Sequence, residues 1–77
     1  MKYRIFYKKF YKTEKEALKA LEEVKGKATN PKISRGIQRK DLWLVILYDN
    51  ATYERCLTGV AHYNAMGLEC YIQRMEG

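Results

Sequence analysis

Apolar and polar positions change along this chain in blocks, and the first blocks predict a strand followed by a helix. Residues 3–10 are dense in aromatic and β-branched side chains, which is typical of a strand. Thr13 and Glu16 have the spacing of a capping box, in which the Thr side chain caps one backbone amide and the Glu side chain reaches back to another. Apolar residues then follow at helical spacing, and Gly26 suits the left-handed geometry that ends a helix. We therefore expect a helix over residues 13–25.

Two further strands are predicted after a loop at residues 26–31, which contains the single proline. Residues 33–39 alternate in the manner of a strand with one face toward the core. Residues 42–48 are so uniformly apolar that they predict a central strand, either covered on both faces or offering one face to a partner. Lys40 and Asp41 form the short turn between these two strands.

The last third of the chain predicts a second helix and a fourth strand. Residues 49–52 supply polar caps for a helix over residues 51–66, which Gly67 ends. Residues 68–73 alternate between apolar and polar types, as a half-buried strand does. The inner stripe of the second helix is expected to comprise Tyr53, Cys56, Leu57, Val60, Ala61 and Ala65.

The order of these elements predicts the fold class. Right-handed crossovers in each strand–helix–strand half put both helices on one face of a four-stranded antiparallel sheet. We therefore expect residues 1–77 to form a single small α+β domain, a βαββαβ ferredoxin-like sandwich with its other sheet face open. A chain this short buries only roughly 60 to 65% of its unfolded surface, so we expect its stability to be marginal.

Each half of the chain resembles a repeat of the SPOR (sporulation-related) domain family, in which a strand runs into a polar turn, an alanine-rich helix, a glycine and a returning strand. The matching segments are residues 10–26 (FYKTEKEALKALEEVKG) and residues 48–72, around GLECYI at 67–72. The resemblance implies a fold similar to that of RNA-recognition domains and a sheet that binds peptidoglycan glycan strands. Where the family has a glycine that ends the first strand, this chain has YKKF at residues 7–10. We therefore carry over the fold and no binding residues.

The charge of the chain is concentrated in its first half. Residues 1–40 hold thirteen Lys or Arg and four Glu, a net charge of +9, whereas residues 41–77 hold two Arg and five acids, a net charge of −3. In the basic half the cations alternate with aromatic rings, most densely over residues 3–12. Cations beside aromatic faces suit an anionic partner with stackable groups, such as RNA or single-stranded DNA.

Strand alternation predicts which side chains the open sheet face presents. Phe6, Trp43 and Tyr71 would form an aromatic platform bordered by Arg4 and Lys8, the arrangement that stacks bases in RNA-recognition sheets. The alternative is that these rings close a homodimer interface or serve only as strand formers. The side chains expected on this face are Arg4, Phe6, Lys8, Phe10, Trp43, Val45, Glu69, Tyr71 and Gln73.

A second group of cations is expected to follow a phosphate backbone, with each neutralised phosphate adding salt-dependent affinity. The alternative is a solvated surface that keeps a small protein in solution. The members of this group are Lys9, Lys12, Lys15, Lys25, Lys27, Lys32, Arg35, Arg39 and Lys40.

Catalysis finds little support in the sequence. His62 is the single histidine, and Cys56 lies about 120° away from it around the same helix, so the two cannot form a nucleophile–base pair. The sequence has no paired Cys or His spacing for zinc, no acidic cluster for magnesium and no glycine-rich phosphate loop. We expect a protein that is not an enzyme and holds no cofactor or metal, with Cys56 and Cys70 as buried thiols.

Three functions remain open at this point. The first is a binding domain for RNA or single-stranded DNA, and the second is a small regulator or inhibitor, of the phage or mobile-element type, that docks on an acidic protein surface. The third is SPOR-like glycan binding. We expect a cytoplasmic protein without a membrane partner, since no apolar run is long enough to span a bilayer and the N-terminus lacks the apolar region of a signal peptide. We also expect a homodimer, because residues 42–48 offer more apolar strand surface than two helices can cover.

Overall fold

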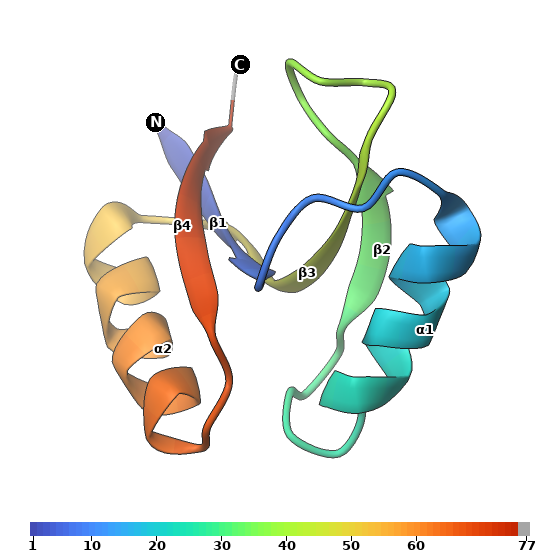
Figure 1. The fold of residues 1–77 in the computed structure, drawn as a ribbon. Coiled ribbons are helices and arrows are strands. Elements are labelled where there is room, and N and C mark those ends of the chain that lie inside the picture. Colours follow the sequence, from blue (N-terminus) through green and yellow to red (C-terminus); the bar gives the residue numbers. More distant parts are fainter. Residues whose placement is uncertain (76–77) are drawn as a thin grey trace.

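The computed structural model, which describes residues 1–75, has the predicted order of elements (Figure 1). The elements are β1 (Lys2–Tyr7), α1 (Glu14–Val24), β2 (Lys32–Arg35), β3 (Trp43–Ala51), α2 (Tyr53–Ala65) and β4 (Cys70–Met75). The strands form one antiparallel sheet in the order β2-β3-β1-β4. This confirms the α+β fold class and the ferredoxin-like topology.

Both helices begin at the predicted threonine caps. The Thr13 hydroxyl accepts a hydrogen bond from the Glu16 amide at 3.1 Å and donates one to Oε1 of Glu16 at 3.1 Å. The Thr52 hydroxyl accepts from the Arg55 amide at 3.3 Å and caps α2 in the same way. The glycine that follows each helix has a positive φ, as a helix-ending glycine should, with 89° at Gly26 and 84° at Gly67.

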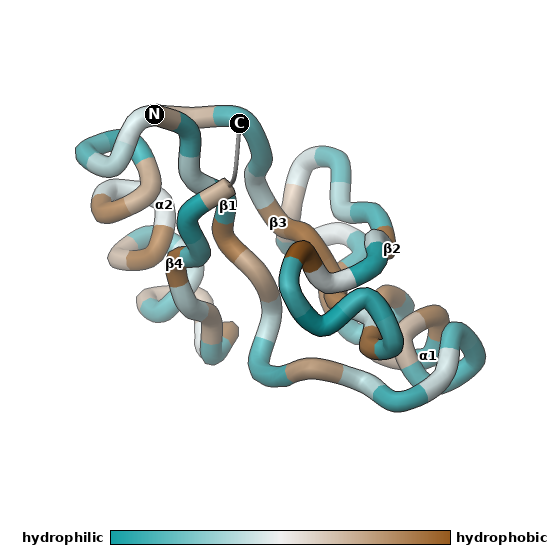
Figure 2. Tube along the Cα trace, turned by 90° about the horizontal axis from the view of Figure 1, so that it is seen from above, coloured by the Kyte–Doolittle hydropathy of each residue, from teal (hydrophilic) through white to brown (hydrophobic). Residues whose placement is uncertain are grey.

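The two helices pack on the same face of the sheet, over different strands. α1 contacts β2 and β3, whereas α2 contacts chiefly β1 and β4. Figures 1 and 2 show the helices lying well apart, toward the two opposite edges of the sheet. The core between the helices and the sheet includes the fully buried side chains of Ile5, Val24, Val45 and Cys56.

The side of α2 that meets the sheet differs from the predicted stripe. Cys56 is buried and Val60 partly buried, as expected, but Tyr63 takes the remaining buried position. A Cβ at Gly59 would lie 2.7 Å from Cδ1 of Ile5, so the helix approaches β1 through its glycine. The hydrophobic pattern misses this face because Gly59 is not apolar, whereas the apolar Leu57, Ala61 and Ala65 beside it lie toward solvent. The exposed members of the predicted stripe are Tyr53, Leu57, Ala61 and Ala65.

β1 ends at Tyr7 instead of Phe10 because the chain turns tightly at Lys8. Lys8 has a φ of 66°, and the Lys9 amide donates to the Tyr7 carbonyl at 2.7 Å, which makes a γ-turn. The chain then returns to the sheet at Tyr11. The Tyr11 amide donates to the Trp43 carbonyl at 2.8 Å, and the Trp43 amide donates to the Tyr11 carbonyl at 2.7 Å. Residues 8–10 therefore form a bulge between two points of pairing with β3.

β3 is longer than predicted and its pairing with β1 is irregular. The partners run from Phe6↔Ile46 through Ile5↔Tyr48 to Tyr3↔Ala51, with a register shift at each step. The shift between Ile46 and Tyr48 places Tyr48 on the helix side of the sheet, opposite Ile5 of the core. The predicted strand over residues 33–39 is also shorter, because β2 ends at Arg35 and residues 36–42 form a loop.

The middle of the apolar run at residues 42–48, residues 44–47, is buried within one chain. Val45 and Leu47 belong to the core under the helices, and they are 0% and 3% exposed. Leu44 and Ile46 alternate with them on the other sheet face, yet they are only 0% and 1% exposed. Tyr48 of the run remains 37% exposed, and Leu42 and Trp43 are only partly buried. One chain therefore covers most of the apolar surface from which we expected a homodimer, and self-association stays a prediction.

Candidate nucleic-acid interface

Three aromatic rings cluster on the sheet face opposite the helices. Phe6 of β1 and Tyr71 of β4 are direct cross-strand partners, and their ring centroids are 5.8 Å apart. The ring of Phe10 lies on the other side of Phe6, at 5.4 Å. Tyr71 is 48% exposed, and Phe6 and Phe10 are partly exposed. This aromatic cluster (Phe6, Phe10 and Tyr71) therefore offers ring surface that the core does not use.

Phe10 reaches the aromatic cluster through the bulge. The sequence predicts Phe10 on this face as the end of a strand, but β1 has already ended and the γ-turn at Lys8 redirects the chain. A Cβ at Gly36 would lie 3.4 Å from Cε2 of Phe10 and 2.4 Å from the Arg39 carbonyl oxygen. Gly36 is therefore what lets the 36–42 loop turn this tightly beside the Phe10 ring.

Arg4 lies on the same sheet face but is only 4% exposed, which corrects the prediction of a cation at the border of the platform. Its Nε donates to Oε1 of Gln73 at 2.8 Å, and its Nη2 donates to the Arg35 carbonyl at 3.4 Å. Burial lowers the pKa of the Arg4 guanidinium, and the nearby Asp49 carboxylate partly opposes this shift. Arg4 thus ties β1 to β4 and to the end of β2, and it has little surface left for a phosphate.

Asp49 is a member of this face that the sequence reasoning missed, because it expected residues 49–52 to cap the second helix. Asp49 lies within β3, and its Oδ2 is 3.0 Å from Nζ of Lys32 on β2. Its Oδ1 is buried without a hydrogen-bond partner among the described residues. No alternation in the sequence marks this continuation of the strand, since residues 48–51 read YDNA.

Trp43 and Val45 lie on the helix-covered face, so the prediction that these two side chains lie on the open face is wrong, and Trp43 is not part of the platform. The guanidinium carbon of Arg35 lies 4.3 Å from the centre of the Trp43 ring, and Nη1 of Arg35 donates to the Lys40 carbonyl at 2.7 Å. Such stacking of a cation on a ring face is attractive. Arg35 is therefore held against Trp43 and by the loop backbone, away from the aromatic cluster.

Several of the cations expected to follow a phosphate backbone have local partners. Nζ of Lys25 is 2.6 Å from Glu22, and Nη2 of Arg39 is 3.2 Å from Asp41. The Arg39 guanidinium, as hydrogen-bond donor and opposite charge, lowers the pKa of the Asp41 carboxyl. Exposed ion pairs of this kind contribute little to stability, so a phosphate can compete for these cations. Exposed lysines without an ion pair within residues 1–75 include Lys12, Lys15, Lys27 and Lys40.

The segment that bulges out of the sheet carries lysines before and after Phe10 in the sequence. Lys8 and Lys9 precede Phe10 and Lys12 follows it, and all three side chains are exposed. The ammonium of Lys9 lies 5.7 Å from the centre of the Tyr11 ring. Glu69 lies beside the same segment, because its carbonyl accepts from the Lys8 amide at 2.9 Å. Oε2 of Glu69 accepts a hydrogen bond from the Tyr71 hydroxyl at 2.6 Å, and this bond raises the pKa of Tyr71. Exposed lysines and one carboxylate therefore lie at the same end of the aromatic cluster.

Neither cysteine is placed to act as a nucleophile. Cys56 and Cys70 are free thiols, 0% and 4% exposed, and burial raises the pKa of both. His62 is exposed on α2, with its ring 5.6 Å from that of Tyr63. Within residues 1–75 no three His, Cys, Asp or Glu side chains gather as metal ligands, and no helix there is long and apolar enough to cross a membrane.

Comparison with known proteins adds no relative to this description. No protein-family model, no curated protein and no solved structure matches the chain. The case for a function therefore rests on the geometry and charge of the two sheet faces.

Proposed function

We propose that this protein is a non-enzymatic binding domain for RNA or single-stranded DNA, which it holds across the sheet face opposite the helices. The observation that carries the proposal is the aromatic cluster, whose three rings lie within 5.8 Å of their neighbours and remain partly exposed. Stacking of a base on an aromatic side chain is worth about 1 to 3 kcal/mol and tolerates any base, since every base has a π face.

The charge distribution supports an anionic partner, because residues 1–40 carry a net charge of +9. The phosphates would run past the bulge, where Lys8, Lys9 and Lys12 are exposed. Each phosphate contact on a single strand should contribute about 0.7 to the salt dependence of the affinity. The bases would stack on Phe10, Phe6 and Tyr71, whose rings neighbour one another in that order.

The proposal is tested by fluorescence anisotropy with labelled U12 and dT12 oligonucleotides at a series of salt concentrations. We expect Phe6→Leu and Tyr71→Leu each to weaken binding by about 1 to 3 kcal/mol while leaving the salt slope unchanged. Lys9→Ala and Lys12→Ala should instead reduce the slope by about 0.7 each. Tyr53→Leu is the matched control, because Tyr53 is an exposed ring on α2, on the helix side of the molecule.

Two results would contradict the proposal in different ways. If Phe6→Leu and Tyr71→Leu bind like the wild type and only the lysine variants weaken, the attraction is electrostatic and the aromatic cluster does not bind bases. If neither oligonucleotide binds at about 0.1 M salt, where specific single-strand binders retain measurable affinity, nucleic acid is not the partner and an acidic protein surface becomes the better candidate.

A further inference from the structure

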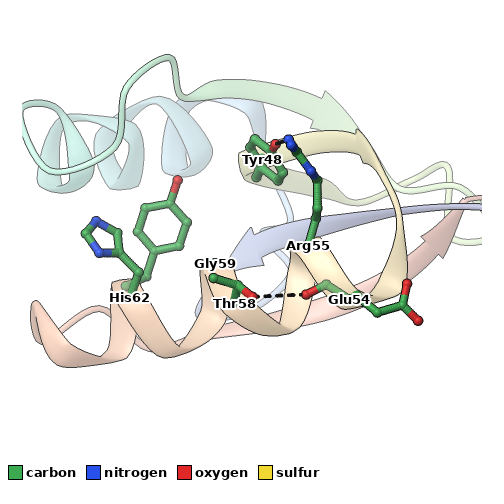
Figure 3. A pocket seen from close by; sticks show the side chains of 7 residues that line it. Tyr48, Glu54, Arg55, Thr58, Gly59 and His62 are labelled. Atoms are coloured by element: carbon green, nitrogen blue, oxygen red, sulfur yellow. Dashed lines mark hydrogen bonds between the residues drawn. The ribbon is translucent and has the colours of Figure 1, made fainter.

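A groove of about 620 Å³ lies on the helix side of the sheet, between α2 and Tyr48 of β3 (Figure 3). It can exist because the two helices lie apart, and because the register shift in β3 turns Tyr48 toward the helices. Tyr48 is 37% exposed there, although it follows directly on a run of buried residues. This volume is within the range of sites that hold small molecules, roughly 300 to 1,000 Å³.

Arg55 reaches across the mouth of this groove. Its Nη1 donates to the Tyr48 hydroxyl at 3.1 Å, so the side chain bridges from α2 to β3 (Figure 3). Within residues 1–75 the Nε–Nη2 edge of the Arg55 guanidinium makes no hydrogen bond, and the guanidinium forms no ion pair. That edge presents two parallel N–H donors, the geometry that binds a carboxylate with two hydrogen bonds.

The other polar lining residues leave room for an anionic ligand. His62 lies seven residues after Arg55, two helical turns along the same side of α2 and about 10 Å away. The carboxylate of Glu54 points away from Tyr48 and His62 (Figure 3). Residues 41–77 contain only two Arg and no Lys, yet one of those two arginines and the single histidine of the chain line this groove. The other arginine of this half, Arg74, does not line the groove.

The walls of the groove suit a flat apolar body. Tyr63 is 8% exposed, and its hydroxyl donates to the Leu47 carbonyl at 3.3 Å, which fixes the ring in place. Tyr48 forms the opposite wall, and its ring is held by the hydrogen bond to Arg55. We propose that the groove binds a small organic anion with a flat apolar body, such as an aromatic carboxylate. The carboxylate bonds to the free edge of Arg55 and the ring system lies between the two tyrosines.

The experiment uses 2-naphthoate as the probe and 2-naphthalenemethanol, its neutral analogue, as the ligand control. Titration of ¹⁵N-labelled protein, followed by amide chemical shifts, should give the largest changes at residues near 48, 55, 59 and 62. We expect Arg55→Gln to weaken the binding of 2-naphthoate about tenfold or more, with Arg55→Lys in between, because a lysine keeps the charge and loses the paired donors. Arg74→Gln, which removes the other arginine of the acidic half, should leave the affinity unchanged.

The proposal is independent of nucleic-acid binding, because the groove and the aromatic cluster lie on opposite faces of the sheet. A saturating oligonucleotide should therefore not displace 2-naphthoate. The proposal is overturned if the neutral alcohol binds as tightly as the anion, if Arg55→Gln binds like the wild type, or if the shift changes map to the aromatic cluster. It is also overturned if the wild-type amides do not shift at millimolar 2-naphthoate.

Discussion

The two helices pack on the same sheet face through different types of residue. α1 meets the sheet through Ala17, Ala20 and Val24, small apolar residues that are at most 4% exposed and follow the helical period of the sequence. α2 meets it through Cys56 and Tyr63, with Gly59 close against Ile5. A helix that approaches a sheet through a glycine can bury a large ring beside it. The contrast shows that apolar periodicity is enough to predict that a helix forms. It predicts which side of the helix is buried only where the residues that contact the sheet are themselves apolar.

The largest expected effect separates the observed side of α2 from the predicted one. Tyr63→Ala should lower the free energy of unfolding by about 3 to 5 kcal/mol, because it removes a buried ring and leaves the Leu47 carbonyl without its donor. Leu57→Ala should cost less than about 1 kcal/mol, since Leu57 is 49% exposed. Urea unfolding of both variants measures the difference. Equal losses in the two variants would mean that α2 is rotated relative to the structure described above.

The close approach at Gly59 gives the second prediction. Gly59→Ala should destabilise the protein by about 1 to 3 kcal/mol, because the new Cβ would lie 2.7 Å from Cδ1 of Ile5, and this exceeds the gain in helix propensity. The same change in an Ile5→Val background, which lacks Cδ1, should cost clearly less. A double-mutant cycle by urea unfolding measures the coupling. Purely additive losses would show that the Ile5 side chain does not limit the approach of the helix.

The polar link between α1 and the sheet predicts a dependence on pH. The Tyr7 hydroxyl donates to Oε1 of Glu23 at 2.8 Å. The pKa of Tyr7 is raised to about 12, chiefly by burial and to a smaller extent by this hydrogen bond. Below pH 10 Tyr7 is protonated in both the folded and the unfolded chain, so its contribution is fully present. Between pH 10 and 12 only the unfolded chain loses the proton, and the stability should fall by about 1 to 2 kcal/mol.

Tyr7→Phe is the variant that isolates this contribution. It should be less stable than the wild type at neutral pH and should show a shallower loss of stability between pH 10 and 12. Unfolding in urea at a series of pH values compares the two proteins. Parallel pH profiles would assign the alkaline loss to other groups.

The helix caps are expected to give the smallest effect. Thr13→Ala and Thr52→Ala should each cost about 1 kcal/mol, since each removes the acceptor for a backbone amide. The loss should be larger for Thr13, whose hydroxyl also donates to Glu16 and whose bond to the backbone amide is shorter. Thermal unfolding monitored by circular dichroism resolves differences of this size. The reverse order would show that the Glu16 contact adds nothing to the cap.

The sequence was sufficient for those features that local rules control. Turn residues and caps located both helices to within two residues, and alternation placed Phe6 and Tyr71 on the same sheet face. Alternation could not place Trp43, because in a run that is apolar at every position from 42 to 48 neither face is marked as the outer one. The same run concealed the register shift that turns Tyr48 toward α2.

The remaining errors concern contacts between residues far apart in the chain. Arg4 was expected to be exposed because an arginine in an alternating strand usually is, but Gln73 and the Arg35 carbonyl, from β4 and from the end of β2, bury it. Phe10 joins the aromatic cluster only because a γ-turn at a non-glycine residue interrupts β1. Such a turn has no marker in the sequence, since Lys8 is an ordinary residue in an unusual conformation.

The two buried thiols allow the opening rate of the α2–β4 side of the molecule to be measured by alkylation. Cys56 lies in α2 and Cys70 in β4, both are buried, and α1 has no cysteine. Burial keeps an alkylating reagent away from both sulfurs, and it also raises the pKa of both thiols, which lowers their reactivity. The reagent should therefore react with each sulfur only when the surrounding segment opens. The rate of mass gain in the unmodified protein would then time the opening of that side without any engineered label, while openings of α1 alone would leave the mass unchanged.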